Sequence, residues 1–241
     1  MTALFDLTGK RALVTGAAGD IGAAICALLG TAGAQVLASD QNAADPAFAA
    51  DLADPEGPGS LARAVLDSGG ADILILNAGA EGPVGPAHLA EDAALDRLFQ
   101  INLRSALTLT AALVPAMARR GGGAVVLMGS IARARGNRHI GAYGLTKAAL
   151  SQHARNLAVE WGPQNVRANA LAPGLIATRF AASLMADTDF MARRMAATPL
   201  RRPGTVDEIA GTVLWLVSPA GAFVTGQTII ADGGTLISDV T

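Results

Sequence analysis

The sequence predicts an α/β fold, a doubly wound parallel sheet built as a single domain across residues 1–241. Short apolar segments alternate with helical segments along the whole chain, which is the pattern of strands joined by crossover helices. Residues 72–76 and 124–128 are apolar almost throughout, as strands covered on both faces are. No internal repeat, linker or charge block divides the chain. Right-handed crossovers then place helices on both faces of the sheet.

Each element follows from a local pattern. The first strand, residues 11–15, runs into a glycine-rich turn, and Ile21, Ile25 and Leu29 then recur at helical spacing until Gly33 ends the helix. The remaining strands are expected at residues 35–39, 72–76, 124–128, 166–171 and 227–231, and the remaining helices near residues 91–119, 143–162 and 207–217. Only ten residues lie between Asp40 and Asp51, which allows a stunted helix or a loop. The Pro/Gly-rich residues 55–59 are interpreted as a loop.

The composition argues against several classes of protein. Hydrophobic residues make up 51% of the chain and charged residues 16%, unlike a disordered protein. A net charge of −2 and 4% aromatic residues argue against binding to nucleic acid or to an anionic membrane. Residues 1–10 do not have the pattern of a signal peptide, and no segment approaches the roughly 18 apolar residues of a membrane span. We therefore expect a cytoplasmic protein with no nucleic-acid or membrane partner.

Cysteine and histidine residues are few. The single cysteine, Cys26, lies in an apolar helical pattern and is expected to be a packed thiol. One cysteine cannot form an intramolecular disulfide, which suits a reducing compartment. His88, His139 and His153 lack the spacing of metal ligands, so no metal site is expected.

A glycine-rich turn between the first strand and the first helix indicates a dinucleotide. Gly16, Gly19 and Gly22 let the backbone approach a pyrophosphate, and the helix N-terminus offers unpaired N–H groups and a partial positive charge. Asp40 closes the second strand, where a carboxylate accepts hydrogen bonds from the adenosine ribose and repels a 2′-phosphate. NAD is therefore favoured over NADP. The alternatives are an ordinary turn and a solvated loop aspartate.

Three side chains that follow the strand at residues 124–128 are the candidate catalytic residues. Ser130 lies just beyond the strand, and Tyr143 and Lys147 lie four residues apart in the next helical segment. Residues i and i+4 share one helix face, so Tyr143 and Lys147 point into the same space. Ser130 can face them outside the carboxyl ends of the strands, where such sheets bind ligands. Taken singly, each residue has an ordinary structural alternative, such as a helix cap or a surface charge.

With these residues in order, the chain resembles the short-chain dehydrogenase/reductase family over nearly its whole length. The matching pieces are Thr15–Gly22, Asn77-Ala78-Gly79, Asn102, Ser130, Tyr143-x-x-x-Lys147, Pro173-Gly174 and Asp232-Gly233-Gly234. The resemblance implies a Rossmann-type fold, a bound nicotinamide cofactor and a homotetramer, with a homodimer as the alternative.

The resemblance also implies a role for each site residue. Tyr143 would be the general acid or base, because positive charge on Lys147 and on the nicotinium ring lowers the pKa of a phenol from its usual value of about 10. Ser130 would bind the substrate oxygen, Lys147 would also bind the nicotinamide ribose, and Asn102 would support a water relay to Lys147. The implied cofactor contacts are Gly16, Asp20, Ile21, Gly22, Asp40, Asp51, Leu52, Asn77, Ala78, Gly79, Tyr143, Lys147, Pro173, Gly174, Ile176 and Thr178.

Two positions depart from the family pattern. Asp20 stands where the family usually has glycine, and its carboxylate either repels the pyrophosphate or caps the helix and faces solvent. Leu76 stands where the family often has asparagine, which is interpreted as a packing change at the strand end.

Two segments are expected beside the substrate. Residues 131–142 contain Arg133, Arg135, Arg138 and His139. We hypothesise that an arginine of this segment helps to bind an anionic or polyhydroxylated substrate, and the alternative is a solvated or interfacial loop. By the resemblance, residues 180–203 form a mobile lid whose methionines either adapt to varied apolar shapes or pack against the core.

The leading prediction is an NAD-dependent oxidoreductase that interconverts a secondary alcohol (a polyol, a sugar or a hydroxy acid) and its ketone by hydride transfer. The alternatives are a 3-ketoacyl-thioester reductase of the same family, which usually needs NADPH, and an NAD-binding protein without turnover. A sugar-nucleotide epimerase is disfavoured because a long C-terminal substrate domain is not seen in the sequence.

Overall fold

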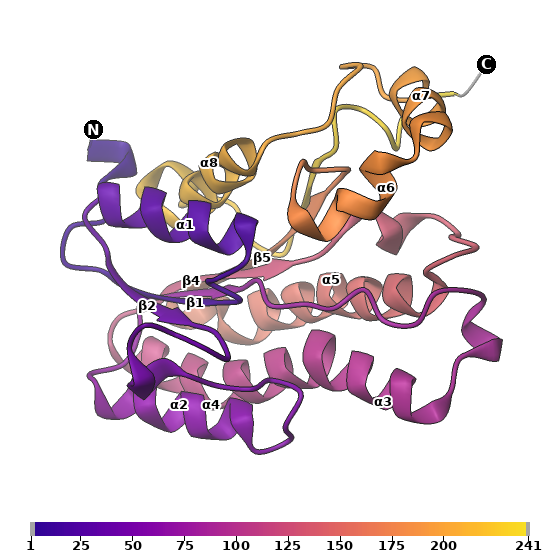
Figure 1. Ribbon diagram of the computed structural model, residues 1–241. Coiled ribbons are helices and arrows are strands. Elements are labelled where there is room, and N and C mark those ends of the chain that lie inside the picture. The colour runs from indigo at the N-terminus through magenta and orange to yellow at the C-terminus, as the bar shows by residue number, and fades with distance from the viewer. Residues whose placement is uncertain (1–2, 240–241) are drawn as a thin grey trace.

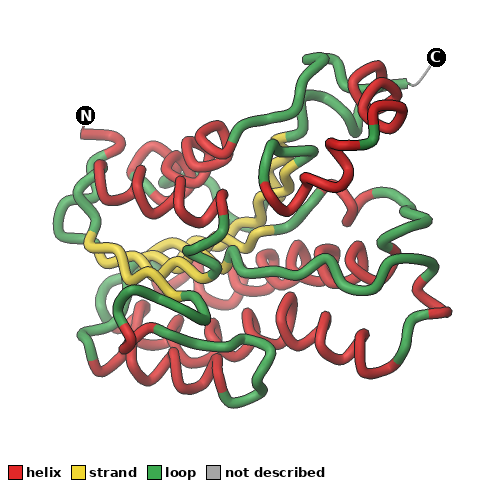
Figure 2. Tube along the Cα trace, viewed as in Figure 1, coloured by secondary structure: helices red, strands yellow, loops and turns green. Residues whose placement is uncertain are grey.

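Six parallel strands form one sheet at the centre of the structure, a computed structural model that describes residues 3–239 (Figure 1, Figure 2). The strands are β1 Arg11–Thr15, β2 Gln35–Ser39, β3 Ile73–Leu76, β4 Gly123–Met128, β5 Val166–Pro173 and β6 Thr228–Ala231. Their order across the sheet is β2-β1-β3-β4-β5-β6. Val14 of β1 pairs with Ala38 on one side and with Ile75 on the other. Each strand predicted from the sequence is therefore present.

Helices cover both faces of the sheet, which confirms the doubly wound, Rossmann-type fold. Figure 1 shows α1 and α8 together on one face and α2, α4 and α5 on the other. The helices are α1 Asp20–Thr31, α2 Gly57–Asp67, α3 Asp92–Phe99, α4 Ser105–Arg119, α5 Gly141–Trp161, α6 Ala182–Ala186, α7 Thr188–Ala196 and α8 Val206–Val217. Cys26 of α1 packs against the core between the sheet and helices α1 and α8, and burial raises the pKa of its thiol to about 11.

The strand order opens a crevice above the carboxyl ends of β1 and β3. From β1 the chain crosses outward to β2, and it then returns to the other side of β1 as β3. At such a switch point the loops that follow the two strands diverge, and ligands bind between them. The glycine turn follows β1 at this point.

The interpretation of residues 55–59 as a loop was wrong at its C-terminal end, because α2 begins at Gly57. Proline is tolerated in the first turn of a helix, where its missing N–H has no intrahelical partner. Pro58, Leu61, Ala62 and Val65 bury one face of this helix at helical spacing. The short segment after Asp40 does form only a stunted turn, a 3-10 helix at Pro46–Phe48.

The helix expected near residues 91–119 is present, but its backbone hydrogen bonds change from the α pattern to the π pattern and back again. A π-helical turn, Gln100–Arg104, separates α3 from α4. Within the described residues, Asp92–Arg119 is the one stretch that is long and apolar enough to span a membrane by length and composition alone. Leu109, Leu113 and Met117 of this stretch are buried in the core that α2 and α5 share.

Candidate active site

Tyr143 and Lys147 lie side by side because both project from one face of α5. Lys147 Nζ lies 5.4 Å from the centre of the Tyr143 ring. It donates a hydrogen bond of 2.8 Å to the carbonyl oxygen of Met128, the last residue of β4. Ser130 follows two residues later, and its hydroxyl interacts with the Tyr143 phenol. The three residues predicted from spacing therefore form one cluster at the carboxyl end of β4.

Burial shifts the pKa values of this cluster in opposite directions. It raises the pKa of the Tyr143 phenol to about 12, while the Ser130 hydrogen bond lowers this value and the nearby Glu81 carboxylate raises it. Burial also lowers the pKa of the Lys147 ammonium to about 8. In the protein alone, Lys147 therefore loses its proton before Tyr143 does. A further positive charge is needed to bring the phenol toward the neutral range.

Asn102 lies in the π-helical turn and is 2% exposed. Its Oδ1 accepts a hydrogen bond from the Ala80 N–H (2.7 Å), and its Nδ2 donates to the Ala80 carbonyl (2.9 Å) and to Thr146 Oγ1 (3.1 Å). These bonds join the loop after β3 to α5, one residue before Lys147. π-Helical turns are frequent at functional sites because they redirect a side chain. Asn102 thus positions the backbone around Lys147.

The glycine turn leaves no room for side chains. A Cβ on Gly22 would lie 2.1 Å from the Gly16 carbonyl oxygen, and a Cβ on Gly16 would lie 2.9 Å from the Ala78 Cα. Gly16 also has a φ of +66°, a conformation that glycine adopts readily. Asn77 Nδ2 donates to the carbonyl oxygens of Thr15 (3.1 Å) and Gly16 (3.2 Å). The turn is therefore held as a bare backbone cradle at the N-terminus of α1, as a bound pyrophosphate requires.

A second glycine contact lies beside Lys147. A Cβ on Gly79 would lie 3.1 Å from Lys147 Nζ and 3.4 Å from Asn102 Oδ1. The loop after β3 therefore passes directly over the amine, and a larger residue would displace it. The predicted Asn77-Ala78-Gly79 segment thus links the glycine turn to the cluster around Tyr143.

Two carboxylates lie at the other end of the crevice. Asp40 accepts hydrogen bonds from the N–H groups of Ala18 (3.1 Å) and Gln41 (2.8 Å), which hold its side chain at the glycine turn. Asp51 accepts from the Ala53 N–H and from Gln41 Nε2, each at 2.8 Å, and these two bonds lower the pKa of its carboxyl group. This end of the crevice is therefore acidic.

Asp20, the first departure from the family pattern, forms an ion pair with Arg179. Its Oδ1 accepts from Arg179 Nε at 2.7 Å, and its Oδ2 accepts from the Arg179 backbone N–H at 2.6 Å. Arg179 also donates to the Ala18 carbonyl at 3.1 Å. The backbone hydrogen bond is the larger cause that lowers the pKa of the Asp20 carboxyl group. The structure shows neither of the two expected orientations of Asp20. Its carboxylate is instead neutralised by Arg179, which belongs to a segment distant in the sequence, after Thr178.

One cavity of about 1120 Å³ joins these features. It is lined by every predicted site residue except Asn102, which is buried behind it. The lining includes Gly16, Asp20, Ile21, Gly22, Asp40, Asp51, Leu52, Asn77, Ala78, Gly79, Ser130, Tyr143, Lys147, Pro173, Gly174, Ile176 and Thr178. A pocket lined by both a bare glycine turn and a half-buried tyrosine has the volume and the chemistry for a dinucleotide and a small substrate.

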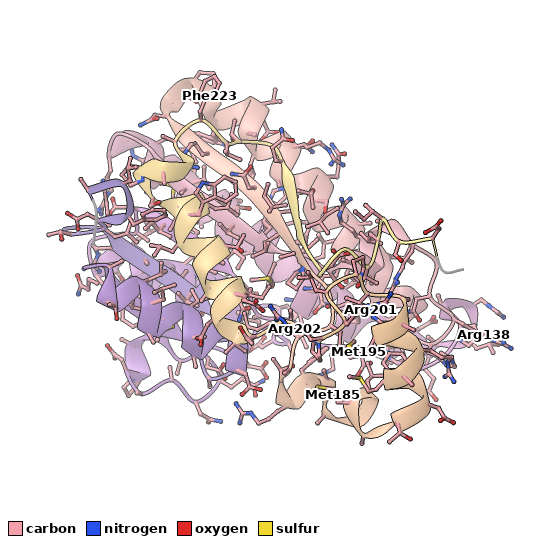
Figure 3. The ribbon with its side chains drawn as sticks, turned by 90° about the horizontal axis from the view of Figure 1, so that it is seen from above. Arg138, Met185, Met195, Arg201, Arg202 and Phe223 are labelled. Atoms are coloured by element: carbon pink, nitrogen blue, oxygen red, sulfur yellow. The ribbon has the colours of Figure 1, made fainter. Side chains whose placement is uncertain are left out.

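The segments expected beside the substrate line the cavity only in part. Arg135 and His139 line it, whereas Arg133 and Arg138 do not. Figure 3 shows Arg138 at the outer edge of the molecule. Phe190, Arg193 and Arg194 of the expected lid line the cavity. Met191 and Met195, the latter labelled in Figure 3, do not line it.

Sequence reasoning missed four polar residues that organise this site. Thr15 Oγ1 accepts hydrogen bonds from the N–H groups of Asn77 and Ala78, each at 3.1 Å, and Thr146 bonds Asn102. The periodicity of α5 places Thr146 inside the core, which was a usable signal. The positions of Arg179 and Arg194 depend on contacts between distant segments, so no local pattern indicates them. Across residues 3–239, no group of three or more His, Cys, Asp or Glu residues is arranged to hold a metal ion.

Comparison with known proteins shows the family to which the chain belongs. Residues 16–235 match the family model described as "Enoyl-(Acyl carrier protein) reductase". The chain is 35% identical to "Dehydrogenase/reductase SDR family member 4" of Bos taurus, over 95% of this chain and 88% of that one.

Two solved structures share the fold closely. A 7α-hydroxysteroid dehydrogenase complexed with NADH and 7-oxo glycochenodeoxycholic acid is 34% identical, with a TM-score of 0.89 and 97% of each chain covered. A gluconate 5-dehydrogenase from Burkholderia cenocepacia, in complex with NADP and tartrate, is 30% identical, with a TM-score of 0.91 and coverage of 98% of this chain and 99% of that one. The chain belongs to the short-chain dehydrogenase/reductase family of oxidoreductases.

Proposed function

We propose that this chain is an NAD-dependent dehydrogenase that interconverts a secondary alcohol (a polyol, a sugar or a hydroxy acid) and its ketone. The observation that carries the proposal is the cluster of Tyr143, Ser130 and Lys147 in a cavity that is also lined by a bare glycine turn. The cluster provides a proton donor or acceptor, a hydrogen-bond donor for an oxygen atom and a cation. A reaction that moves a hydride needs these three functions at the carbon that reacts.

The residues of the cavity fit a nicotinamide dinucleotide. The cradle formed by Gly16 and Gly22 would hold the pyrophosphate against the N-terminus of α1, and Lys147 would hold the nicotinamide ribose. Pro173, Gly174 and Thr178 would border the nicotinamide ring. When bound, the cofactor supplies or accepts the hydride and, in its oxidised form, contributes a positive charge.

Tyr143 moves the proton. In alcohol oxidation its phenolate oxygen accepts the hydroxyl proton of the substrate, and in ketone reduction its phenol returns a proton to the new alkoxide. Ser130 holds the same substrate oxygen and stabilises the charge that develops on it. Lys147 and Asn102 then connect Tyr143 to solvent through a water relay. Since burial raises the pKa of Tyr143 to about 12, this role depends on positive charge beside the phenol.

The acidic end of the cavity supports NAD over NADP. Asp40 and Asp51 both line it, and Arg179, which lines the cavity near the glycine turn, is paired with Asp20. A 2′-phosphate would carry two negative charges toward these carboxylates, whereas ribose hydroxyl groups would donate hydrogen bonds to Asp40. Other members of the family bind NADP, so this choice depends on the residues of this chain.

The exposed apolar side chains of α4 and α5 support assembly into a homotetramer or a homodimer. Leu107 of α4 and Leu145 and Val159 of α5 are exposed, Val159 to 80%. Apolar side chains that gather on helix faces are common at interfaces between identical subunits. The mass of the purified protein, measured by light scattering, tests this assembly: a monomer at micromolar concentration would contradict it. We also propose that the protein acts in the cytoplasm.

The experiment that tests the function follows nicotinamide absorbance with secondary alcohols, polyols and hydroxy acids and with their ketones, each with NAD(H) and with NADP(H). The expected result is turnover with NAD(H) that falls by at least about a hundredfold in Tyr143→Phe, while that variant still binds NADH. Turnover that survives in Tyr143→Phe would contradict the role of the phenol. Preferred reduction of a 3-ketoacyl thioester with NADPH would support the acyl-thioester reductase, and tight NADH binding without any turnover would support a binding protein.

A further inference from the structure

Two arginines converge on the substrate end of the cavity from different segments. Arg135 follows the 3-10 helix Ile131–Ala134, directly after Ser130, whereas Arg194 lies on α7 of the expected lid. Both line the cavity that also contains Tyr143. The two side chains thus line the same cavity, although they lie 59 positions apart in the sequence.

Neither guanidinium group has a carboxylate partner in the described part of the chain. The three ion pairs within residues 3–239 are Arg120–Asp72, Arg179–Asp20 and Arg202–Glu208. Arg194 is partly buried, and its Nε is a buried donor without a hydrogen-bond partner among these residues. A buried, unpartnered guanidinium donor is unusual, because the group loses hydration without gaining a bond.

The charges around the two arginines leave an excess of positive charge. Burial and, to a smaller extent, the positive charge of Arg135 lower the pKa of Arg194 to about 10, so the two cations are close enough to repel. Asp232 opposes this effect at both arginines. Its carboxylate, however, already accepts the N–H groups of Gly234 (2.8 Å) and Leu236 (2.7 Å). Two cations therefore face one carboxylate that is engaged with the backbone.

We propose that Arg135 and Arg194 bind a carboxylate of the substrate, so that the natural substrate pair is a hydroxy acid and its keto acid. This inference rests on the proposed function and names the substrate class within it. The planar guanidinium group matches a carboxylate in shape and donates two parallel hydrogen bonds. Since Arg194 lies on α7, the same anion would hold the lid over the cavity while the substrate is bound.

The test compares matched pairs of anionic and neutral substrates, such as gluconate with sorbitol and 3-hydroxybutyrate with 2-butanol, in the whole protein with NAD⁺. The expected result is a kcat/KM at least about tenfold higher for the best hydroxy acid than for its neutral counterpart. Arg135→Ala and Arg194→Ala should each raise the KM for that acid by about ten- to a hundredfold, since each removes charged hydrogen bonds. Arg138→Ala is the control, because Arg138 belongs to the same loop but does not line the cavity.

A preference for neutral alcohols, or a hydroxy-acid preference that survives in both variants, would overturn the inference while leaving the proposed function intact. If no substrate turned over, the function would fail, and the anion site would still be measurable by thermal unfolding of the NADH-saturated protein. Stabilisation by gluconate or 3-hydroxybutyrate that is lost in Arg194→Ala but kept in Arg138→Ala would support the site. No stabilisation by either acid would overturn it.

Discussion

The ion pair between Asp20 and Arg179 makes a specific prediction about cofactor binding. Asp20 places a carboxylate in the first turn of α1, next to the cradle proposed for the pyrophosphate. Arg179 neutralises this carboxylate through its side chain at 2.7 Å and also bonds its backbone N–H to it at 2.6 Å. Replacing Arg179 with alanine keeps the backbone bond to Asp20 and removes the cation, together with its hydrogen bond to the Ala18 carbonyl. The carboxylate would then repel the two phosphate charges of the cofactor.

The size of the effect follows from the exposure of the pair. The side chain of Arg179 is 78% exposed and that of Asp20 is 26% exposed, so water screens the repulsion strongly. One unpaired carboxylate that faces two phosphates at such a water-exposed site changes a dissociation constant by about three- to tenfold. Arg179→Ala should therefore weaken NADH binding by that factor at low salt, and the effect should shrink as ionic strength rises.

The assay is a titration of NADH fluorescence with four proteins: the original chain, Arg179→Ala, Asp20→Asn and the double variant. Asn keeps a hydrogen-bond acceptor for the Arg179 N–H but carries no charge. The double variant should bind NADH about as tightly as the original chain, because the carboxylate that needed neutralising is gone. Weak binding in the double variant would show that Arg179 itself holds the phosphate. Normal binding in Arg179→Ala would refute the reasoning altogether.

Three further predictions concern the cradle, the ribose end and the buried lysine. Gly22→Ala should abolish measurable NADH binding and cost about 1–3 kcal/mol of stability, because its Cβ would lie 2.1 Å from the Gly16 carbonyl oxygen; an unchanged Kd would contradict this. Asp40→Ala should raise the NADP-to-NAD ratio of kcat/KM by about tenfold, and an unchanged ratio would show that Asp40 does not discriminate. Lys147→Met should abolish turnover yet raise the free energy of unfolding at pH 7 by up to about 3 kcal/mol, since burial lowers the pKa of Lys147 from 10.5 to about 8. Between pH 8 and pH 10.5, the Lys147 amine is protonated in the unfolded chain but neutral in the folded protein. The original chain therefore gains stability as pH rises through this range, and the stability advantage of the variant should shrink. Urea unfolding across this range measures it, and a less stable variant at pH 7 would contradict the account.

The sequence predicted those parts of the fold that depend on local pattern. Short apolar runs marked the six strands, and four-residue spacing brought Tyr143 and Lys147 together. Helix α2 was not predicted from the sequence at all, because the prolines and glycines around residue 57 favour a loop and obscure the helical spacing of Leu61, Ala62 and Val65. Nothing local indicated that Asn102 would lie in a π-helical turn, since the choice between α and π hydrogen bonding depends on packing around it.

Contacts between distant segments could not be predicted. Asp20 and Arg179 lie 159 residues apart, and the sequence alone left open whether the carboxylate would repel a pyrophosphate or cap the helix. The approach of Arg135 to the lid residue Arg194 has no local signal either, although the arginine-rich loop itself is evident in the sequence. In both cases the residue type indicated a charged group in the site. Which residue contacts that group depends on how the segment after β5 folds back over the cavity.

The central claim is that Tyr143 handles the proton beside a bound nicotinamide, and one measurement tests it directly. Tyr143 is the only tyrosine in the chain, so protein labelled with ¹³C at the tyrosine ζ carbon gives a single NMR resonance to assign. In the protein alone, this resonance should not titrate up to pH 10, because the pKa is about 12. A positive charge about 5 Å away at an effective dielectric of about 20 is worth about 3 kcal/mol, or about 2 pKa units. NAD⁺ should therefore move the midpoint to about 10, and partial ionisation should be visible by pH 9.5. A resonance that does not respond to NAD⁺, or that already titrates near 10 without it, would contradict the account.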